Sequence, residues 1–284
     1  MKLTVISGLS GSGKSIALHT LEDLDYYCVD NLPLGLLPSL SPLLESNLAA
    51  GRPVAVSIDA RNDVSGLNAF PGILEELSQQ GIECEILFLR SDADALLTRY
   101  SESRRKHPLS GDDTPLAEAI DREARLLEGI ANRADLIIDT THTHVHQLRE
   151  LIRERVHGRQ PRTLSVLLQS FGFKHGVPAD TDFVFDVRCL PNPHWDPQLR
   201  PLTGRDQPVA EFLAGHGSVQ DMFTHLEQFI KTWIPSFQAD NRSYLTFSIG
   251  CTGGQHRSVY LTERLHASVS AHFPNVLLRH RELS

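Results

Sequence analysis

Two stretches of the sequence combine glycines with side chains that bind phosphate. The first, Gly8-Leu-Ser-Gly-Ser-Gly-Lys-Ser15, fits the P-loop pattern G-x-x-x-x-G-K-S. The second, Ser248-Ile-Gly-Cys-Thr-Gly-Gly-Gln-His-Arg-Ser-Val-Tyr260, has the Cys-to-Arg spacing of a cysteine-phosphatase loop. The chemistry that these residues suggest is therefore phosphate binding at two places, with or without cleavage of a phosphate bond.

The first stretch predicts a nucleotide-binding loop, because it follows a predicted strand at residues 3–6 and precedes a helical pattern. Glycines let backbone N–H groups converge on phosphate oxygens, and the start of a helix adds about half a positive charge. We expect Lys14 to reach the β- and γ-phosphates and the Ser15 hydroxyl to bind Mg²⁺, so these two residues are the catalytic candidates. The predicted loop consists of Gly8, Leu9, Ser10, Gly11, Ser12, Gly13, Lys14 and Ser15.

A carboxylate that serves the Mg²⁺ ion is expected at the end of a neighbouring strand. Asp30 in YYCVDN and Asp59 in VAVSIDARN both end apolar runs. The run before Asp59 favours this residue, although either carboxylate would also suit an ordinary helix cap. No Asn/Thr-Lys-x-Asp motif that reads guanine is present, so the pattern leaves ATP and GTP both open.

A basic segment, Arg99-Tyr-Ser-Glu-Ser-Arg-Arg-Lys-His-Pro108, follows the fourth predicted strand. Its Arg104, Arg105 and Lys106 resemble the arginine-bearing lid of small P-loop kinases, where cations neutralise the transferred phosphoryl group. A solvated helix face is the alternative interpretation, and the pattern favours it.

The second stretch predicts an anion site built from backbone N–H groups of residues 252–255, a helix start and a bidentate Arg257 guanidinium. Cleavage would need a Cys251 thiolate and a general acid, for which Asp186 and Asp196 are candidates. The phosphatase interpretation is weakened because Gly250 replaces the usual histidine before such a cysteine.

Two polar segments follow predicted strands of the second half, SFGFKHG at 170–176 and RCLPNPHWD at 188–196. The carboxyl ends of strands are where α/β proteins place ligand groups. Lys174, His175 and His194, together with Asp186, would suit a phosphorylated ligand that carries hydroxyl groups.

The elements that must position these residues follow from hydrophobic periodicity. Apolar runs at 3–6, 27–29, 54–58, 86–89 and 136–138 alternate with helical patterns, which predicts an α/β fold with a parallel, doubly wound sheet. Gly158 and Pro161 predict a linker at 157–162 between a domain at 1–156 and a smaller α/β domain at 163–284. The second domain has strand candidates at 164–168, 183–187 and 244–249.

Composition limits the class of protein. Four scattered cysteines favour a reducing compartment, and no stretch has the apolar length of a membrane span, so we expect a cytoplasmic protein without membrane contact. The net charge of −8 divides into −9 for residues 1–156 and +1 for residues 157–284. This asymmetry indicates that the second domain is the better suited to anionic partners.

The motifs GLSGSGKS, YYCVDNLP, IDARN, SFGFKHG, RCLPNPHWDPQLRPLTG, NRSYLTFSIGCTGGQHRSVY and the closing RHR together resemble the RNase adapter protein RapZ family over essentially the whole chain. The resemblance implies an ATP site at Gly8 to Ser15 and a GTP segment at Asp59, Ala60, Arg61 and Asn62. It also implies a P-loop kinase-like first domain, a second domain that senses glucosamine-6-phosphate, homo-oligomers and, in enterobacterial members, binding of small regulatory RNA that is presented to an endoribonuclease. Our hypothesis from the motifs and the resemblance together is a regulatory adapter with weak NTPase activity.

The resemblance also implies the residues of the sugar-phosphate pocket, which are Lys174, His175, Asp186, His194, Cys251, Thr252, Gly253, Gly254, His256 and Arg257. Members that bind RNA carry a lysine-rich extension after the RHR element, whereas this sequence stops at Arg281-Glu-Leu-Ser284. Because Lys and Arg contacts supply most non-specific RNA affinity, we expect RNA binding to be weaker here. A small-molecule P-loop kinase and a phosphatase that uses Cys251 and Arg257 are the alternative functions.

Overall fold

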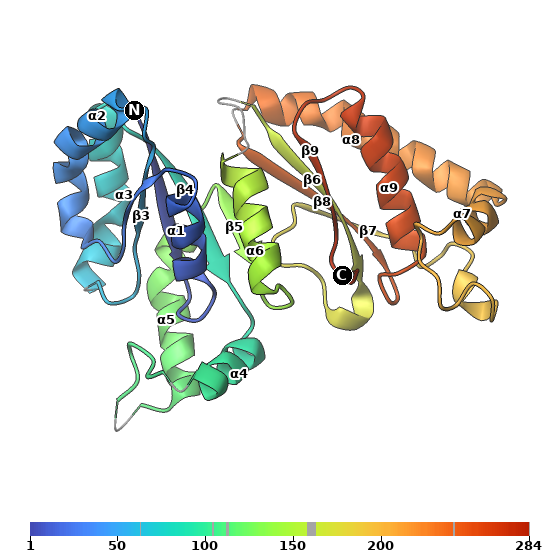
Figure 1. The fold of residues 1–284 in the computed structure, drawn as a ribbon, viewed down its shortest axis with the longest axis horizontal. Helices are drawn as coiled ribbons and strands as arrows, with labels where there is room; N and C mark the ends of the chain where they lie inside the picture. The colour runs from blue at the N-terminus through green and yellow to red at the C-terminus, as the bar shows by residue number, and fades with distance from the viewer. Residues whose placement is uncertain (63, 104, 112–113, 158–162, 241, 284) are drawn as a thin grey trace. The chain divides into compact units, whose positions relative to one another are not determined.

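The chain divides into two units, Met1–Gly158 and Arg159–Ser284, each built on its own parallel sheet (Figure 1). The computed structural model describes residues 1–62, 64–103, 105–111, 114–157, 163–240 and 242–283. Most of the linker expected at 157–162 lies outside these residues; its first residue ends a short π-helix, η2 (Arg153–His157).

The first unit contains a five-stranded sheet in the order β2-β3-β1-β4-β5, with every neighbouring pair parallel. Its strands are β1 (Lys2–Gly8), β2 (Tyr27–Val29), β3 (Val54–Ser57), β4 (Glu83–Arg90) and β5 (Leu136–Asp139). The predicted α/β class and the predicted strands are confirmed. β1 lies between β3 and β4, so the loop that follows it opens at the middle of the sheet's carboxyl edge.

Helices cover both faces of this sheet because each strand must cross over to the next parallel one. α1 packs against α6 on one face, and α3 packs against α5 on the other (Figure 1). The helices are α1 (Lys14–Glu22), α2 (Ser41–Ala49), α3 (Val64–Gln79), α4 (Ala93–Ser103), α5 (Leu116–Ala131) and α6 (Val145–Ile152), and a 3₁₀ segment, η1 (Leu34–Leu40), precedes α2. The continuous apolar runs of β1 and β4 are buried between these layers, as expected for a parallel sheet.

The second unit contains a four-stranded parallel sheet in the order β7-β8-β6-β9. Its strands are β6 (Ser165–Gly172), β7 (Phe183–Asp186), β8 (Tyr244–Cys251) and β9 (Val276–His280). Its helices are α7 (Gln207–Ala214), α8 (Gly217–Ala239) and α9 (Arg257–Ser270), with 3₁₀ turns η3 (Phe173–His175) and η4 (Pro193–Trp195). The parallel arrangement brings the segments after β6, β7 and β8 to one edge of the sheet.

The sequence pattern missed β9, which forms one edge of this second sheet. Four of its five residues are only half-buried and one of them is Arg279, so the strand lacks the fully buried apolar run that identifies the central strands β6 and β8. Among the described residues, no helix is both long and apolar enough to cross a membrane.

Gly250 in β8 faces two aromatic rings, which explains why a larger residue is absent there. A Cβ atom at this position would lie 2.5 Å from ring atoms of both Phe171 and Phe173. We expect Gly250→Ala to lower the free energy of unfolding by about 1–3 kcal/mol through overpacking, measured by urea unfolding. Gly217→Ala, which introduces a Cβ with no neighbour within 4 Å, is the control; equal stability of the two variants would contradict the assignment.

Candidate functional site

The P-loop leaves the end of β1 through backbone conformations that only glycine adopts readily. Gly8 has a φ angle of 143°, and a Cβ atom there would lie 2.1 Å from the carbonyl oxygen of Leu89. Gly13 has a φ angle of 107°, and its Cβ would meet Leu148 at 2.6 Å. Leu9 and Ser12 support the turn, since the Ser12 hydroxyl donates to the Leu9 carbonyl at 2.6 Å.

Lys14 and Ser15 begin helix α1 directly after the loop. The Lys14 Nζ atom donates to the Gly8 carbonyl oxygen at 2.6 Å, so the ammonium group is held against the loop. Burial lowers the pKa of Lys14, and the nearby carboxylates of Glu123 and Asp59 oppose that shift. The Ser15 side chain is exposed at the start of α1, where its hydroxyl can bind a metal ion.

Both candidate carboxylates lie at the carboxyl edge of the sheet, but they have different partners. Asp59 follows β3, the neighbour of β1; its Oδ1 atom accepts the Arg61 backbone N–H at 2.9 Å, and Oδ2 accepts Nε and Nη2 of Arg61 at 2.8 and 2.6 Å. Burial raises the pKa of Asp59, but the hydrogen bonds from Arg61 prevail and hold it below its ordinary value. Asp30, after the edge strand β2, is exposed and accepts a hydrogen bond from the Ser57 hydroxyl.

The segment expected to bind GTP has a structural part and an exposed part. Ala60 is buried, and the Asn62 side chain accepts the Leu34 N–H at 2.7 Å and donates to the Asp59 carbonyl at 3.1 Å. These contacts fix the loop after β3 against η1. Only the Arg61 and Asp59 side chains of this segment reach the cavity beside the P-loop.

A cavity of about 640 Å³ opens over the P-loop. Its walls carry an unusual number of cationic side chains, contributed by the P-loop, the loop after β3, α4 and the segment after α4: Lys14, Arg61, Arg99, Arg105 and Lys106. Arg104 of the expected lid lies outside the described residues. Arg105 and Lys106 are exposed, as the interpretation as a solvated face expects, and they also line the cavity, as the interpretation as a lid expects.

The donor set at this site fits a nucleotide with Mg²⁺. Ser15 and Asp59 line the cavity, and their side-chain oxygens are the hard ligands that Mg²⁺ prefers; the ion usually keeps several waters and substrate phosphates as its other ligands. Asp30 does not line the cavity. The backbone of the loop and Lys14 would hold the phosphates.

A second cavity, of about 350 Å³, lies at the carboxyl edge of the sheet in the second unit. It is lined by Lys174, His175, Asn192, His194, Cys251, Thr252, Gly253, Gln255, His256 and Arg257. The structure thus brings together eight of the ten residues proposed from the sequence and adds Asn192 and Gln255. Both residues lie within the motifs LPNPHWD and CTGGQHR, which also contain expected ligands. Their position in the sequence beside those ligands could have identified them as pocket residues.

Two of the expected pocket residues have other positions. The Asp186 carboxylate accepts hydrogen bonds from Nε and Nη2 of Arg188, the closest at 2.7 Å, and does not line the cavity. Gly254 does not line the cavity; it has a φ angle of 72°, and a Cβ atom there would lie 2.4 Å from a carboxylate oxygen of Glu282. Gly254 therefore permits the close approach of the loop to the end of the chain.

Arg257 is 4% exposed, and its guanidinium is held in place by backbone carbonyls. Its Nη1 atom donates to the carbonyl oxygens of Arg188 and Leu190 at 2.7 and 3.0 Å. Among the described residues, Nη2 reaches only the Thr252 hydroxyl, at 3.3 Å, and Nε has no hydrogen-bond partner. The expected bidentate contact is thereby restricted to the Nε and Nη2 edge of the guanidinium.

The geometry around Cys251 gives little support to phosphate-ester cleavage. Its buried thiol lies 3.1 Å from the Ser258 hydroxyl, the partner expected for a phosphatase loop. However, none of the described residues that line this cavity is an Asp or Glu, and Asp196 caps the Gln198 N–H at 2.8 Å. A carboxylic acid that would protonate the leaving oxygen is therefore missing from the described walls.

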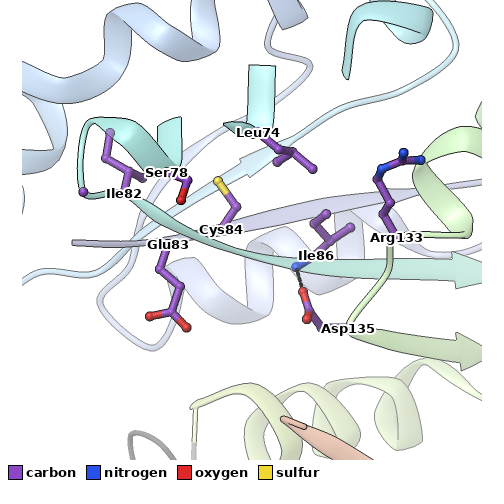
Figure 2. Close-up of a pocket in the computed structure, with 9 residues that line it drawn as sticks. Leu74, Ser78, Ile82, Glu83, Cys84, Ile86, Arg133 and Asp135 are labelled. Carbon is purple, nitrogen blue, oxygen red and sulfur yellow. Dashed lines mark hydrogen bonds between the residues drawn. The ribbon is translucent and has the colours of Figure 1, made fainter. Parts of the chain in front are cut away.

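A further cavity, of about 600 Å³, opens at the opposite edge of the first sheet (Figure 2). Its described lining includes no residue of the P-loop or of the loop after β8. Glu83 and Cys84 begin β4 there, and the Asp135 carboxylate accepts the Ile86 N–H at 2.8 Å. Burial raises the pKa of the Cys84 thiol to about 11, so this cysteine is neutral at pH 7.

Comparison with known families and proteins covers both units of the chain. The model of the RapZ-like N-terminal domain matches residues 1–160, and that of the RapZ C-terminal domain matches residues 164–284. A nucleotide-binding protein of Methylococcus capsulatus is 57% identical over 284 residues, which cover 100% of this chain and 96% of the relative. Another, from Thioalkalivibrio sulfidiphilus, is 56% identical over 290 residues and is covered completely, as is this chain.

Solved structures similar to the chain include shikimate kinase from Acinetobacter baumannii in complex with shikimate, at a TM-score of 0.37 and 14% identity, covering 56% of this chain and 94% of that one. A gluconokinase from Sinorhizobium meliloti has a TM-score of 0.33 and 16% identity, covering 53% and 89%. These TM-scores are low, so the fold of the first unit is assigned from this chain's own strand order and P-loop.

The position of Lys14 gives a direct test of the first site. We expect Lys14→Ala to lower the affinity for Mg²⁺-ATP and Mg²⁺-GTP at least about tenfold, the loss typical of a charge-assisted hydrogen bond, measured by isothermal titration calorimetry. Arg52→Ala removes an exposed cation just before β3, at the other end of the strand, and should leave the affinity unchanged. Equal affinities for Lys14→Ala and the natural sequence would contradict the assignment.

Proposed function

Because the chain belongs to the RapZ family, we propose that it is a nucleotide-binding regulatory adapter that senses a sugar phosphate. In this proposal the P-loop kinase-like unit binds ATP or GTP with Mg²⁺ and hydrolyses it slowly. The second unit binds glucosamine-6-phosphate or a similar sugar phosphate. The adapter acts in the cytoplasm as a homo-oligomer and presents small regulatory RNA to an endoribonuclease.

The observation that carries the sensing function is the state of Arg257 in the second cavity. Burying a guanidinium N–H without a partner costs free energy, and a phosphate that accepts from Nε and Nη2 would remove that cost. The same phosphate would lie at the amino terminus of α9, where backbone N–H groups and the helix dipole favour an anion. Two independent features therefore support an anionic group at one position.

The rest of the cavity suits the sugar part of such a ligand. Its volume of about 350 Å³ is near the lower end of the usual range for small-molecule sites. Imidazole groups of His175 and His194 can exchange hydrogen bonds with hydroxyl groups. The side-chain amides of Asn192 and Gln255 offer acceptors for an amino group, which supports an amino-sugar phosphate.

Burial affects His256 at the same site. Burial lowers the pKa of His256, and its Nε2 atom lies 3.2 Å from the Leu199 carbonyl oxygen. A neutral ring that donates to this carbonyl would fix the start of α9 without adding a charge. If His256 is neutral, the positive charges of the pocket that would contact the ligand come from Lys174 and Arg257.

A small-molecule kinase is the second candidate, and the cluster of cations around the first cavity favours it. Arg99, Arg105 and Lys106 would neutralise a phosphoryl group in transfer. Transfer of phosphate from ATP to an added metabolite, lost in Lys14→Ala, would favour this function over slow hydrolysis to phosphate.

Titration of the full chain with glucosamine-6-phosphate tests the sensing function. We expect saturable binding, no binding of glucosamine, and an affinity at least about tenfold lower in Arg257→Lys, because lysine keeps the charge but loses the two-pronged edge. Arg242→Lys, which changes an exposed arginine paired with Asp182 in the same unit, is the matched control. Absence of heat with the natural sequence, or equal affinity for glucosamine, would refute the proposal.

A further inference from the structure

A buried carboxylate lies beside the P-loop and joins it to another part of the first unit. The Glu123 side chain, on α5, has no exposed surface. Its Oε2 atom accepts the Ser10 backbone N–H at 2.8 Å, and its Oε1 atom accepts the Ser10 hydroxyl at 2.6 Å. In the described part of the chain, no Lys or Arg side chain lies within ion-pair distance of Glu123, although the Lys14 ammonium interacts with its carboxylate electrostatically. Direct hydrogen bonds therefore contribute to stabilising this buried group.

His107 supplies the third hydrogen bond to Glu123. The Leu109 backbone N–H donates to Nδ1 of His107 at 3.1 Å, so this nitrogen carries no proton and the ring is neutral. The proton is therefore on Nε2, which donates to Oε2 of Glu123 at 3.1 Å. The ring is held at both nitrogens and also contacts Tyr100, with 5.3 Å between the ring centroids.

The buried position of His107 contrasts with that of its neighbours. Arg105 and Lys106 come directly before it and are exposed, and residues 108–110 are exposed or half-buried. His107 is thus the anchor that fixes this segment to the body of the unit. Arg105 and Lys106 line the cavity above the P-loop, as does Tyr100.

We propose that the hydrogen-bonded chain Ser10–Glu123–His107 holds Arg105 and Lys106 over the P-loop, where they bind the phosphates of a nucleoside triphosphate. Glu123 and His107 are then positioning residues: neither lines the cavity, and both act through the two cations. The chain ties the phosphate loop itself, through Ser10, to the cationic segment that faces it. This inference rests on nucleotide binding at the P-loop.

Pre-organisation explains why a buried carboxylate suits this task. Long cationic side chains on a free segment would lose conformational freedom each time a nucleotide binds. An anchor with four hydrogen bonds, three to Glu123 and one to His107, restricts the backbone of the segment in advance. The affinity gained should therefore depend on Arg105 and Lys106 being present.

A thermodynamic cycle tests this dependence in the full chain, with calorimetric titration of Mg²⁺-ATP and Mg²⁺-GTP. We expect the double variant Arg105→Ala with Lys106→Ala to lose about tenfold in affinity, as for lost charge-assisted contacts to phosphate. His107→Ala should lose a similar factor in the natural background and almost none in the double variant, because its effect passes through the two cations.

Two substitutions at Glu123 separate positioning from general stability. Glu123→Gln can keep the hydrogen bonds that link Ser10, residue 123 and His107. The amide oxygen accepts from Ser10 N–H and His107 Nε2–H, while the amide N–H donates to the Ser10 hydroxyl. We expect its affinity to stay within about threefold of the natural value, whereas Glu123→Ala should behave like His107→Ala. Glu118→Gln, an exposed carboxylate on the first turn of α5, is the matched control and should change nothing.

The outcomes distinguish this inference from the proposed function. Absence of nucleotide binding in the natural sequence would overturn both. Binding that is unchanged in the double variant would overturn the inference alone, and this result is accessible even if His107→Ala and Glu123→Ala do not fold, since Arg105 and Lys106 are exposed. An equal loss from His107→Ala in both backgrounds would also overturn it, because the residue would then act on stability or on the P-loop alone.

Discussion

Each cavity depends on a cation that is held by backbone carbonyl oxygens beside the start of a helix. Lys14 donates to the Gly8 carbonyl at the P-loop, and Arg257 donates to the carbonyls of Arg188 and Leu190 in the second unit. Both helices follow a parallel strand and a glycine turn, so backbone N–H groups gather at the same place as the cation. The two units thus offer anions the same kind of environment on different sheets.

Burying a charged side chain costs free energy, and the surrounding groups offset that cost differently in the two units. In the first unit, carboxylates offset the desolvation of Lys14, and Glu123 is itself satisfied by Ser10 and His107. In the second unit, no Asp or Glu of the described residues lines the cavity, and Nε of Arg257 is left without a partner. The buried charges of Lys14 and Glu123 thus have partners without a ligand, whereas the second site has an unsatisfied donor that an anion would satisfy.

The sequence predicted the elements well where one local signal sufficed. The buried apolar runs identified the central strands, and the glycine spacing identified the loop from Gly8 to Ser15. It missed the edge strand β9, whose residues are mostly half-buried. The ion pairs of Asp59 with Arg61 and of Asp186 with Arg188 were also not predicted from the sequence. The spacing of these residues does not reveal which carboxylates pair with a neighbouring arginine. The Glu123–Ser10 contact joins residues 113 positions apart, which only the folded chain brings together.

A crystal structure of the full chain with glucosamine-6-phosphate bound measures the central claim most directly. The account predicts the phosphate at the amino terminus of α9, with its oxygens at about 2.7–2.9 Å from Nε and Nη2 of Arg257. It predicts no change in the bonds from Nη1 to the carbonyls of Arg188 and Leu190. A phosphate bound away from Arg257, or bound at the P-loop instead, would contradict the account.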